Sequence, residues 1–360
     1  MHIYIEYQAK NYPQTQKILK KFPNAEIIWI KNYKNIFDKQ IPFNKSLKPS
    51  FVVAKLTWNS ILKAPDWYGH NNKTAYFLKT SLNCIFDCDY CYLKWAFKND
   101  IPVYFVNYED IKNEIRWVIQ MNQIRKENIW KDEGMMGKDK MDDLSLSFQN
   151  QSSSYKDKIW FYTSDYSDIL GMNGISGFLE EFVPFFEQFE NAMMEIRSKS
   201  ANIKPILDLW FVPKNTEFAF SLNPQELIDK YEKWTSSLKD RIKAINTLLE
   251  KWYKVWLRFL PLLPVKNYEK IYTEFVDYIK KSIPMEKIAS TFVSGLLYTK
   301  DDYKKMLKKM PNLDVLYFLE EEDEYFVRES RKARDFFYDL FSQLDKQCFI
   351  CLDSKGDLEI

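Results

Sequence analysis

The sequence predicts an α/β protein built on a parallel sheet. Of its 360 residues, 46% are hydrophobic and 17% are aromatic, which is enough to bury a large core. From residue 158 onward, strand-like apolar runs alternate with helical segments, a pattern typical of repeated β-α units. Polar residues follow several of these runs, and parallel sheets carry their sites at the carboxyl ends of the strands.

The N-terminal part has the pattern of a small β-α-β unit. Residues 2–7 alternate as a strand does, residues 13–22 have a helical pattern, and residues 25–30 are again strand-like. A third apolar run covers residues 51–56. We expect residues 1–74 to form an N-terminal α/β segment that packs against the main domain.

The main domain is expected over residues 75–299. Its strands are expected at 75–80, 101–106, 158–162, 193–197, 217–222, 255–261 and 288–297, with 207–212 pairing nearby. Its helices are expected at 108–125, 174–190, 238–252 and 267–282. Residues 126–156 are polar and lack apolar periodicity, which indicates an exposed insertion. Residues 300–360 are expected to form a C-terminal extension of helices and strands that contacts the substrate.

Four of the predicted strands end in residues that suit a binding site. These residues are Thr163-Ser164-Asp165, Lys199, Ser221-Leu222-Asn223 and Pro261. Because the carboxyl ends of parallel strands meet at one edge of a sheet, we expect them to form the floor of a cavity.

Three of the five cysteines form the motif Cys84-x3-Cys88-x2-Cys91. A zinc site normally takes a fourth Cys or His, and the only histidines, His2 and His70, lie outside the motif. Three thiolates suit a four-iron cluster that leaves one iron open for an outside ligand. That arrangement is typical of radical S-adenosylmethionine enzymes, in which the cofactor carries the difficult chemistry. The alternative is a structural zinc loop in a non-catalytic metal-binding protein.

Charge and composition limit the remaining classes of protein. The net charge is +2, so nucleic-acid binding would need a local basic patch. The sequence shows no signal peptide, and no apolar run approaches the length of a membrane span. Clustered cysteines fit a reducing compartment better than a disulfide framework. We therefore expect a soluble, cytoplasmic protein.

The motifs, taken together, resemble the spore photoproduct lyase family, radical S-adenosylmethionine enzymes that repair a thymine dimer in DNA. The loop from Cys84 to Cys91, with Tyr90 and Tyr92 on either side of its last cysteine, is similar to the cluster loop of that family. Further segments follow in the order of the family, namely Thr163-Ser164-Asp165, Ser198-Lys199, Phe220-Ser221-Leu222-Asn223 and Leu260-Pro261. The likeness runs over most of the chain.

The resemblance implies a partial (β/α)6 TIM-type barrel, incomplete on one side to admit a bulky substrate. It implies that Cys84, Cys88 and Cys91 hold a [4Fe-4S] cluster. The residues implied to bind S-adenosylmethionine are Tyr90, Ser164, Lys199, Ser221 and Asn223. A lysine suits the carboxylate of the cofactor because it offers a point charge on a flexible stem. The implied partners are damaged DNA and an electron donor such as flavodoxin or ferredoxin, without a membrane.

The resemblance also implies a chemical course. In the family, an adenosyl radical removes a hydrogen from the dimer, the bond joining the thymines breaks, and a cysteine of the protein quenches the product radical. Tyr90 and Tyr92 would relay the radical back towards the cofactor. The position of the quenching cysteine, immediately before Thr163, is Tyr162 in this chain.

The change to tyrosine leaves four alternatives. Tyr162 donates the hydrogen itself, Cys348 or Cys351 replaces it in a rearranged path, lyase activity is lost, or the enzyme acts on a different substrate. That substrate would be RNA, a peptide or a small molecule.

The C-terminal extension carries charged runs of both signs. An acidic run covers 320–324, a basic cluster covers 328–334, and lysines are frequent over 300–309. The basic stretches suit phosphate binding, although a mixed run of this kind is often a solvated face.

Overall fold

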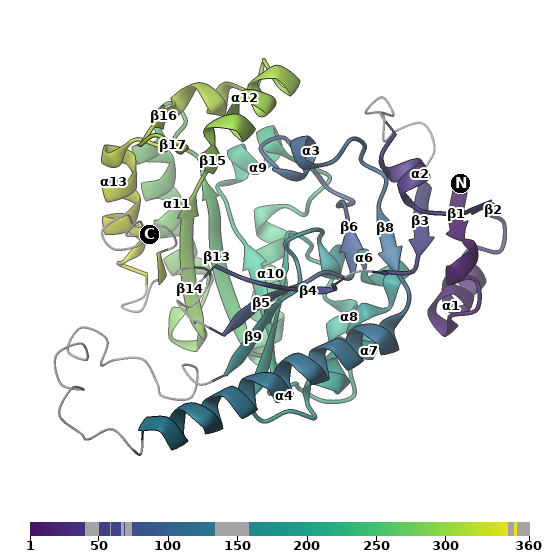
Figure 1. Cartoon of the computed structure of the whole chain (residues 1–360). Helices are drawn as coiled ribbons and strands as arrows, with labels where there is room; N and C mark the ends of the chain where they lie inside the picture. The colour runs from purple at the N-terminus through teal and green to yellow at the C-terminus, as the bar shows by residue number, and fades with distance from the viewer. Residues whose placement is uncertain are drawn as a thin grey trace.

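The computed structural model describes residues 1–39, 50–57, 59–65, 68, 74–133, 158–344 and 349–350. Its centre is a curled eight-stranded sheet in the order β18-β14-β13-β11-β10-β9-β5-β4 (Figure 1). The successive parallel strands are β5 (Ala75–Leu78), β9 (Ile159–Tyr162), β10 (Ala192–Ser198), β11 (Thr216–Ser221), β13 (Val255–Leu262) and β14 (Ser290–Gly295). The antiparallel β4 (Ile61–Lys63) and the parallel β18 (Phe349–Ile350) form the two edges. The expected partial barrel is confirmed.

Helices follow the barrel strands and cover the outer face of the sheet. They are α4 (Tyr108–Glu133), α6 (Ile169–Ser176), α7 (Phe178–Phe186), α8 (Lys204–Leu207), α9 (Gln225–Tyr231), α10 (Leu238–Glu250) and α11 (Tyr268–Ser282). Each longer helix buries one stripe, as α11 does with Tyr272, Phe275, Val276 and Ile279. Among the described residues, no helix is both long and apolar enough to cross a membrane.

A second sheet of five strands lies beside the barrel, in the order β2-β1-β3-β8-β6 (Figure 1, purple to blue). Its strands are β1 (His2–Glu6), β2 (Glu26–Ile30), β3 (Ser50–Ala54), β8 (Val103–Phe105) and β6 (Ser81–Leu82), accompanied by α1 (Pro13–Lys21) and α2 (Lys34–Phe37). The predicted β-α-β unit is confirmed. The sheet also takes β6 and β8 from beyond residue 74, so it reaches to the start of the cysteine loop.

Several of the predicted elements differ from the structure. The helix expected over 174–190 is two helices, α6 and α7, because Gly177 adopts a left-handed φ of 61° between them. Residues 207–212 form no strand; α8 ends at Leu207 and Trp210 is 87% exposed. The helix expected to end at 125 continues to Glu133, and residues 134–157 of the expected insertion lie outside the described part.

The C-terminal extension forms a three-stranded sheet with two helices. The elements are β15 (Leu297–Thr299), α12 (Lys300–Lys309), β16 (Leu319–Glu321), β17 (Phe326–Glu329) and α13 (Arg331–Phe341), with the strand order β15-β17-β16. The run expected as one strand over 288–297 divides, since β14 ends at Gly295 and Leu297 begins β15. Cys348 and Cys351 lie outside the described residues.

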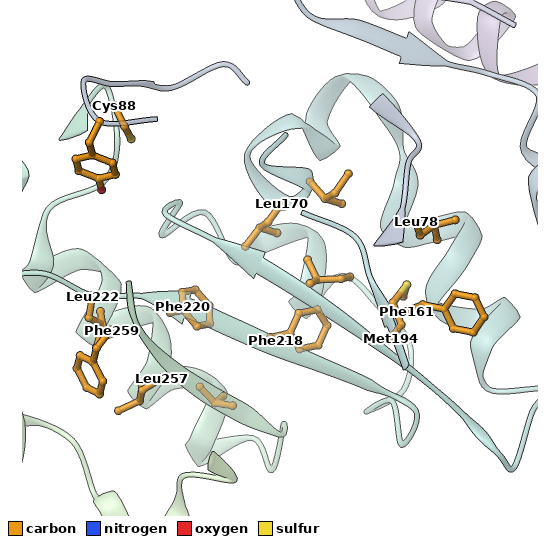
Figure 2. Packing of buried hydrophobic residues seen from close by; sticks show 14 of the residues in the cluster. Leu78, Cys88, Phe161, Leu170, Met194, Phe218, Phe220, Leu222, Leu257 and Phe259 are labelled. Carbon is orange, nitrogen blue, oxygen red and sulfur yellow. The ribbon is translucent and has the colours of Figure 1, made fainter. Parts of the chain in front are cut away.

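Side chains on the barrel strands alternate between two packed regions. Phe161, Met194, Phe218 and Leu257 belong to the main core, which Figure 2 shows with Cys88 at one end. Tyr162 follows Phe161 on β9, and Ala219 follows Phe218 on β11. Both belong to a separate cluster with Trp160 and Trp256. Since alternate residues of a strand face opposite sides, this second cluster fills the inside of the barrel.

Candidate active site

The carboxyl ends of the barrel strands surround a cavity of about 500 Å³. Known small-molecule sites have volumes of roughly 300–1,000 Å³, so a cofactor-sized ligand fits. Residues predicted from the sequence line this cavity together, among them Cys84, Cys88, Cys91, Ser164, Lys199, Ser221 and Pro261. The strand-end residues and the cysteine loop, which are up to 177 positions apart in the sequence, thus meet at one place.

The cysteine loop is anchored from two sides. β7 (Asp87–Cys88) pairs antiparallel with β12 (Glu232–Lys233), which places Cys88 opposite Glu232. From the other side, the Tyr298 hydroxyl donates to the Tyr90 carbonyl at 2.9 Å. Just after the loop comes the short helix α3 (Leu93–Ala96). These contacts fix the loop backbone, so the three thiols are held against the same cavity.

Glu232 is a buried charge directly behind the loop. Its side chain is inaccessible to solvent and accepts hydrogen bonds from the Tyr90 hydroxyl and from Asn223 Nδ2, the latter at 2.9 Å. It also pairs with Arg241 at 2.7 Å and lies 3.8 Å from Lys199 Nζ. Although burial by itself would raise the pKa of Glu232, Lys199 and Arg241 lower it to about 2. The carboxylate is therefore charged and orders the residues behind the cysteines.

Asp168 fixes the end of β10, where Lys199 enters the cavity. Its carboxylate accepts from the Ser198 hydroxyl at 2.7 Å and from the Lys199 amide at 2.8 Å. It also caps α6 by accepting from the Gly171 amide at 2.8 Å. The Lys199 side chain then reaches the Leu260 carbonyl at 3.4 Å, on the neighbouring strand β13.

The remaining residues predicted to bind the cofactor take different places. Ser164 lines the cavity, and its buried hydroxyl has no hydrogen-bond partner among the described residues. Ser221 lines the cavity at the end of β11. Asn223 is fully buried and is not part of the cavity wall; it supports Glu232 and accepts from the Tyr272 hydroxyl at 3.3 Å.

Among the described residues, four tyrosines line the cavity, namely Tyr68, Tyr90, Tyr92 and Tyr298, and Tyr162 packs against the first of them. Tyr90 and Tyr92 line it, and the Tyr92 hydroxyl donates to the backbone carbonyl of Asp165 at 2.5 Å. Tyr162 points into the barrel, is 2% exposed, and does not line the cavity. Tyr68 does line it, with its ring edge against Tyr162 at a centroid distance of 4.9 Å. Tyr162 therefore lies one side chain below the cavity surface.

Comparison with known proteins shows which family the chain is similar to. The family model described as spore photoproduct lyase matches residues 151–325. The spore photoproduct lyase of Clostridium acetobutylicum is 25% identical over 312 residues, which is 86% of this chain and 82% of that protein. Both comparisons identify spore photoproduct lyase as the family that this chain is similar to. The Bacillus subtilis enzyme is 20% identical and aligns with 79% of this chain and 74% of its own length.

Solved structures of the family have the same fold. A mutant spore photoproduct lyase with bound AdoMet and dinucleoside spore photoproduct superposes with a TM-score of 0.73 at 17% identity, covering 98% of both chains. A complex of spore photoproduct lyase with dinucleoside spore photoproduct gives a TM-score of 0.71 at 16% identity, again with 98% of both chains covered. Enzymes of the family are radical S-adenosylmethionine lyases with a [4Fe-4S] cluster.

The cavity of this chain fits those cofactors. Cys84, Cys88 and Cys91 all line this one cavity, and a [4Fe-4S] cluster that leaves one iron for an outside ligand takes three thiolates. Among the described residues, no three Cys, His, Asp or Glu side chains are grouped so that they could hold a single metal ion. Burial and the nearby Glu232 raise the pKa of the Cys88 thiol, and iron would reverse this because a coordinating thiol is deprotonated. The unpartnered hydroxyl of Ser164 matches a polar group of S-adenosylmethionine.

Sequence reasoning missed several residues that shape this site. Tyr68, Asp168, Arg197 and Phe292 line the cavity, and Glu232 organises the residues behind it. Arg197 and Asp168 are close in sequence to predicted residues, so the same argument from the ends of strands could have identified them. Tyr68 and Glu232 carry no local signal, since their places depend on contacts with distant segments.

Proposed function

We propose that this protein is a radical S-adenosylmethionine lyase that reverses a thymine-dimer lesion in DNA. The observation that carries the proposal is the convergence of Cys84, Cys88 and Cys91 with the strand-end residues around one cavity. Similarity to the spore photoproduct lyase family supports the substrate class, because one solved enzyme of that name binds a dinucleoside spore photoproduct. The bound cofactor supplies a carbon-centred radical that abstracts hydrogen.

The residues of the chain would bind and orient this cofactor. We propose that the Lys199 ammonium binds the carboxylate of S-adenosylmethionine, while Ser164 and Ser221 hydrogen-bond its polar groups from the ends of β9 and β11. Tyr90 would pack beside the adenine, held by its bond to Glu232. Asn223 would act through Glu232, since it does not reach the cavity wall.

The first experiment tests cofactor loading. After anaerobic reconstitution, the protein should show the absorbance of a four-iron cluster, and its electron paramagnetic resonance spectrum should change on addition of S-adenosylmethionine. Cys88→Ala should lose both signals because a ligand is missing. Cys348→Ala, which changes a thiol outside the motif, should keep them. A colourless zinc-containing protein would contradict every radical-enzyme assignment.

The second experiment tests the substrate. The reconstituted enzyme with dithionite and S-adenosylmethionine should convert a dinucleotide thymine lesion into two thymines. Cofactor cleavage without consumption of the lesion would instead favour a different substrate, such as RNA, a peptide or a small molecule. The near-neutral net charge of +2 favours this second candidate, because it provides no overall attraction to DNA.

The electron donor and the cellular location belong to the same proposal. A [4Fe-4S] cluster must be reduced by one electron, which a flavodoxin or ferredoxin would deliver. Oxygen-sensitive clusters and thiolate ligands need a reducing environment, and this supports a cytoplasmic location.

A further inference from the structure

The proposed reaction needs a residue that donates a hydrogen atom to the product radical. At the position of the family's quenching cysteine the chain has Tyr162, which is 2% exposed and lies below the cavity surface. A hydrogen atom is transferred only between groups in contact, so a donor has to face the substrate. Tyr68 meets this requirement, because it lines the cavity while its ring covers Tyr162.

We propose that Tyr68 is the residue that donates the hydrogen atom to the product radical. This inference rests on the proposed function, since it concerns the last chemical step of lesion repair. The ring of Tyr68 is fixed by edge contacts with Tyr162 and with Phe77, whose centroids lie 4.9 and 4.7 Å away. Its hydroxyl is therefore held at a defined point of the cavity wall.

The surroundings of the hydroxyl keep it in the form that can donate. The Tyr68 hydroxyl donates to Asp165 Oδ1 at 2.5 Å and accepts from Arg197 Nη1 at 3.2 Å. Burial raises the pKa of Tyr68 well above its ordinary value, and Asp165 raises it further while Arg197 opposes the shift. Tyr68 is a neutral phenol at physiological pH, and only the phenol carries a hydrogen atom to give.

Asp165 also connects Tyr68 to a second tyrosine. The backbone carbonyl of Asp165 accepts from the Tyr92 hydroxyl at 2.5 Å, so Tyr68 and Tyr92 hydrogen-bond to the same residue. Tyr92 directly follows the cluster ligand Cys91. The two phenols thus form a short path from the substrate side of the cavity to the cofactor side.

The proposed step balances atoms and electrons. The O–H bond of Tyr68 breaks homolytically and a C–H bond forms on the thymine radical, which leaves a neutral Tyr68 phenoxyl radical. One electron and one proton from Tyr92 restore Tyr68. The bound cofactor would return to Tyr92 the hydrogen atom that it took from the lesion at the start, and would thereby be regenerated. Over one turnover the protein returns to its initial state.

The test compares Tyr68→Phe with the matched variant Tyr76→Phe. The Tyr68 change keeps the ring and removes only the hydroxyl, while Asp165 keeps its 3.2 Å pair with Arg197. Tyr76, which lies on β5, is also a partly buried tyrosine. It stacks on Phe161 in the main core and does not line the cavity. Both variants should still cleave S-adenosylmethionine and consume the lesion dinucleotide.

Product analysis in deuterated water gives the decisive result. Wild type and Tyr76→Phe should form repaired thymine that carries one deuterium, because a phenol exchanges its hydrogen with solvent. Tyr68→Phe should lose this deuterated product in favour of abortive adducts. A freeze-quenched tyrosyl radical signal, present in the wild type, should also be lost. A purely structural role of Tyr68 would change neither the product ratio nor the radical signal.

Three outcomes would overturn the inference in distinguishable ways. If Tyr68→Phe repairs as the wild type does, with the same deuterium content, Tyr68 is not the donor. The same holds if Tyr162→Phe loses the repaired product while Tyr68→Phe keeps it. If the wild type itself consumes no lesion, the proposed function fails, and the inference fails with it.

Discussion

Lys199 shows how much of the site depends on one charge. It lies at the end of β10, where Asp168 holds its backbone, and its ammonium lies between the Glu232 carboxylate at 3.8 Å and the Leu260 carbonyl at 3.4 Å. An ammonium group has three donors, so it can contact a carboxylate of the cofactor in addition.

Lys199→Gln should weaken binding of S-adenosylmethionine to the reconstituted protein by about 10- to 100-fold. A hydrogen bond to a charged group contributes roughly 1.5–3 kcal/mol, and that contribution is lost with the charge. Anaerobic titration calorimetry measures the effect. Lys204→Gln is the control, because Lys204 is an exposed lysine on α8 paired with Asp208 at 2.6 Å. Equal affinities of the two variants would remove Lys199 from the cofactor site.

Residues at the ends of strands could be predicted from sequence, whereas residues that act through distant contacts could not. Ser164, Lys199 and Ser221 line the cavity as expected, because a parallel sheet brings its strand ends together. Glu232 and Tyr68 escaped prediction, since each is defined by partners far away in the chain. Glu232 binds Tyr90 across 142 positions, and Tyr68 binds Asp165 across 97.

At the level of elements, the junction between α6 and α7 depends on a single glycine. The apolar pattern runs through both helices and therefore predicts one. Gly177 interrupts it with a φ of 61°, and a Cβ placed there would lie 3.0 Å from the side chain of Gln14. Residue periodicity reports which face is buried but does not report a change of backbone direction, so the break was not predictable from the pattern.

Gly177→Ala should lower the free energy of unfolding by about 1–2 kcal/mol, the cost of a left-handed conformation in an L-residue. Gly174→Ala should instead leave it unchanged or raise it by up to about 1 kcal/mol, because alanine is the better helix former. Gly174 lies within α6, and a Cβ there meets nothing within 4 Å. Urea denaturation of both variants provides the comparison. The same sign for both changes would show that the junction tolerates a side chain.

At the level of the whole molecule, the charged runs of the C-terminal extension partly neutralise each other. Glu321 pairs with Lys300 at 2.7 Å, and Glu322 pairs with Arg334 at 2.7 Å and with Arg328 at 3.3 Å. The acidic run and the basic cluster, which the sequence presents as separate surfaces, are thus partners in the fold. Only the three-dimensional arrangement could show this pairing, although both charged runs were visible in the sequence.

We propose that α12, whose first residue Lys300 pairs with Glu321, meets DNA through its other lysines. It begins directly after β15, whose residues Leu297 and Tyr298 line the cavity, and it packs against α3 next to the cysteine loop. Its exposed lysines Lys304 and Lys308 lie one helical turn apart on the same face. A duplex whose lesion enters the cavity would pass this helix.

The double variant Lys304→Gln and Lys308→Gln should make the affinity for duplex DNA less dependent on salt. Each phosphate contact contributes roughly 0.9 to the slope of log affinity against log salt concentration, so the slope should fall by about 2. The control is Lys239→Gln with Lys243→Gln, which removes two exposed lysines of the same spacing from α10 on the outer barrel. Fluorescence anisotropy with a lesion-free duplex at several salt concentrations gives both slopes. An unchanged slope in the α12 variant would place the DNA contact elsewhere, since electrostatic binding follows the number of lysines that meet phosphates.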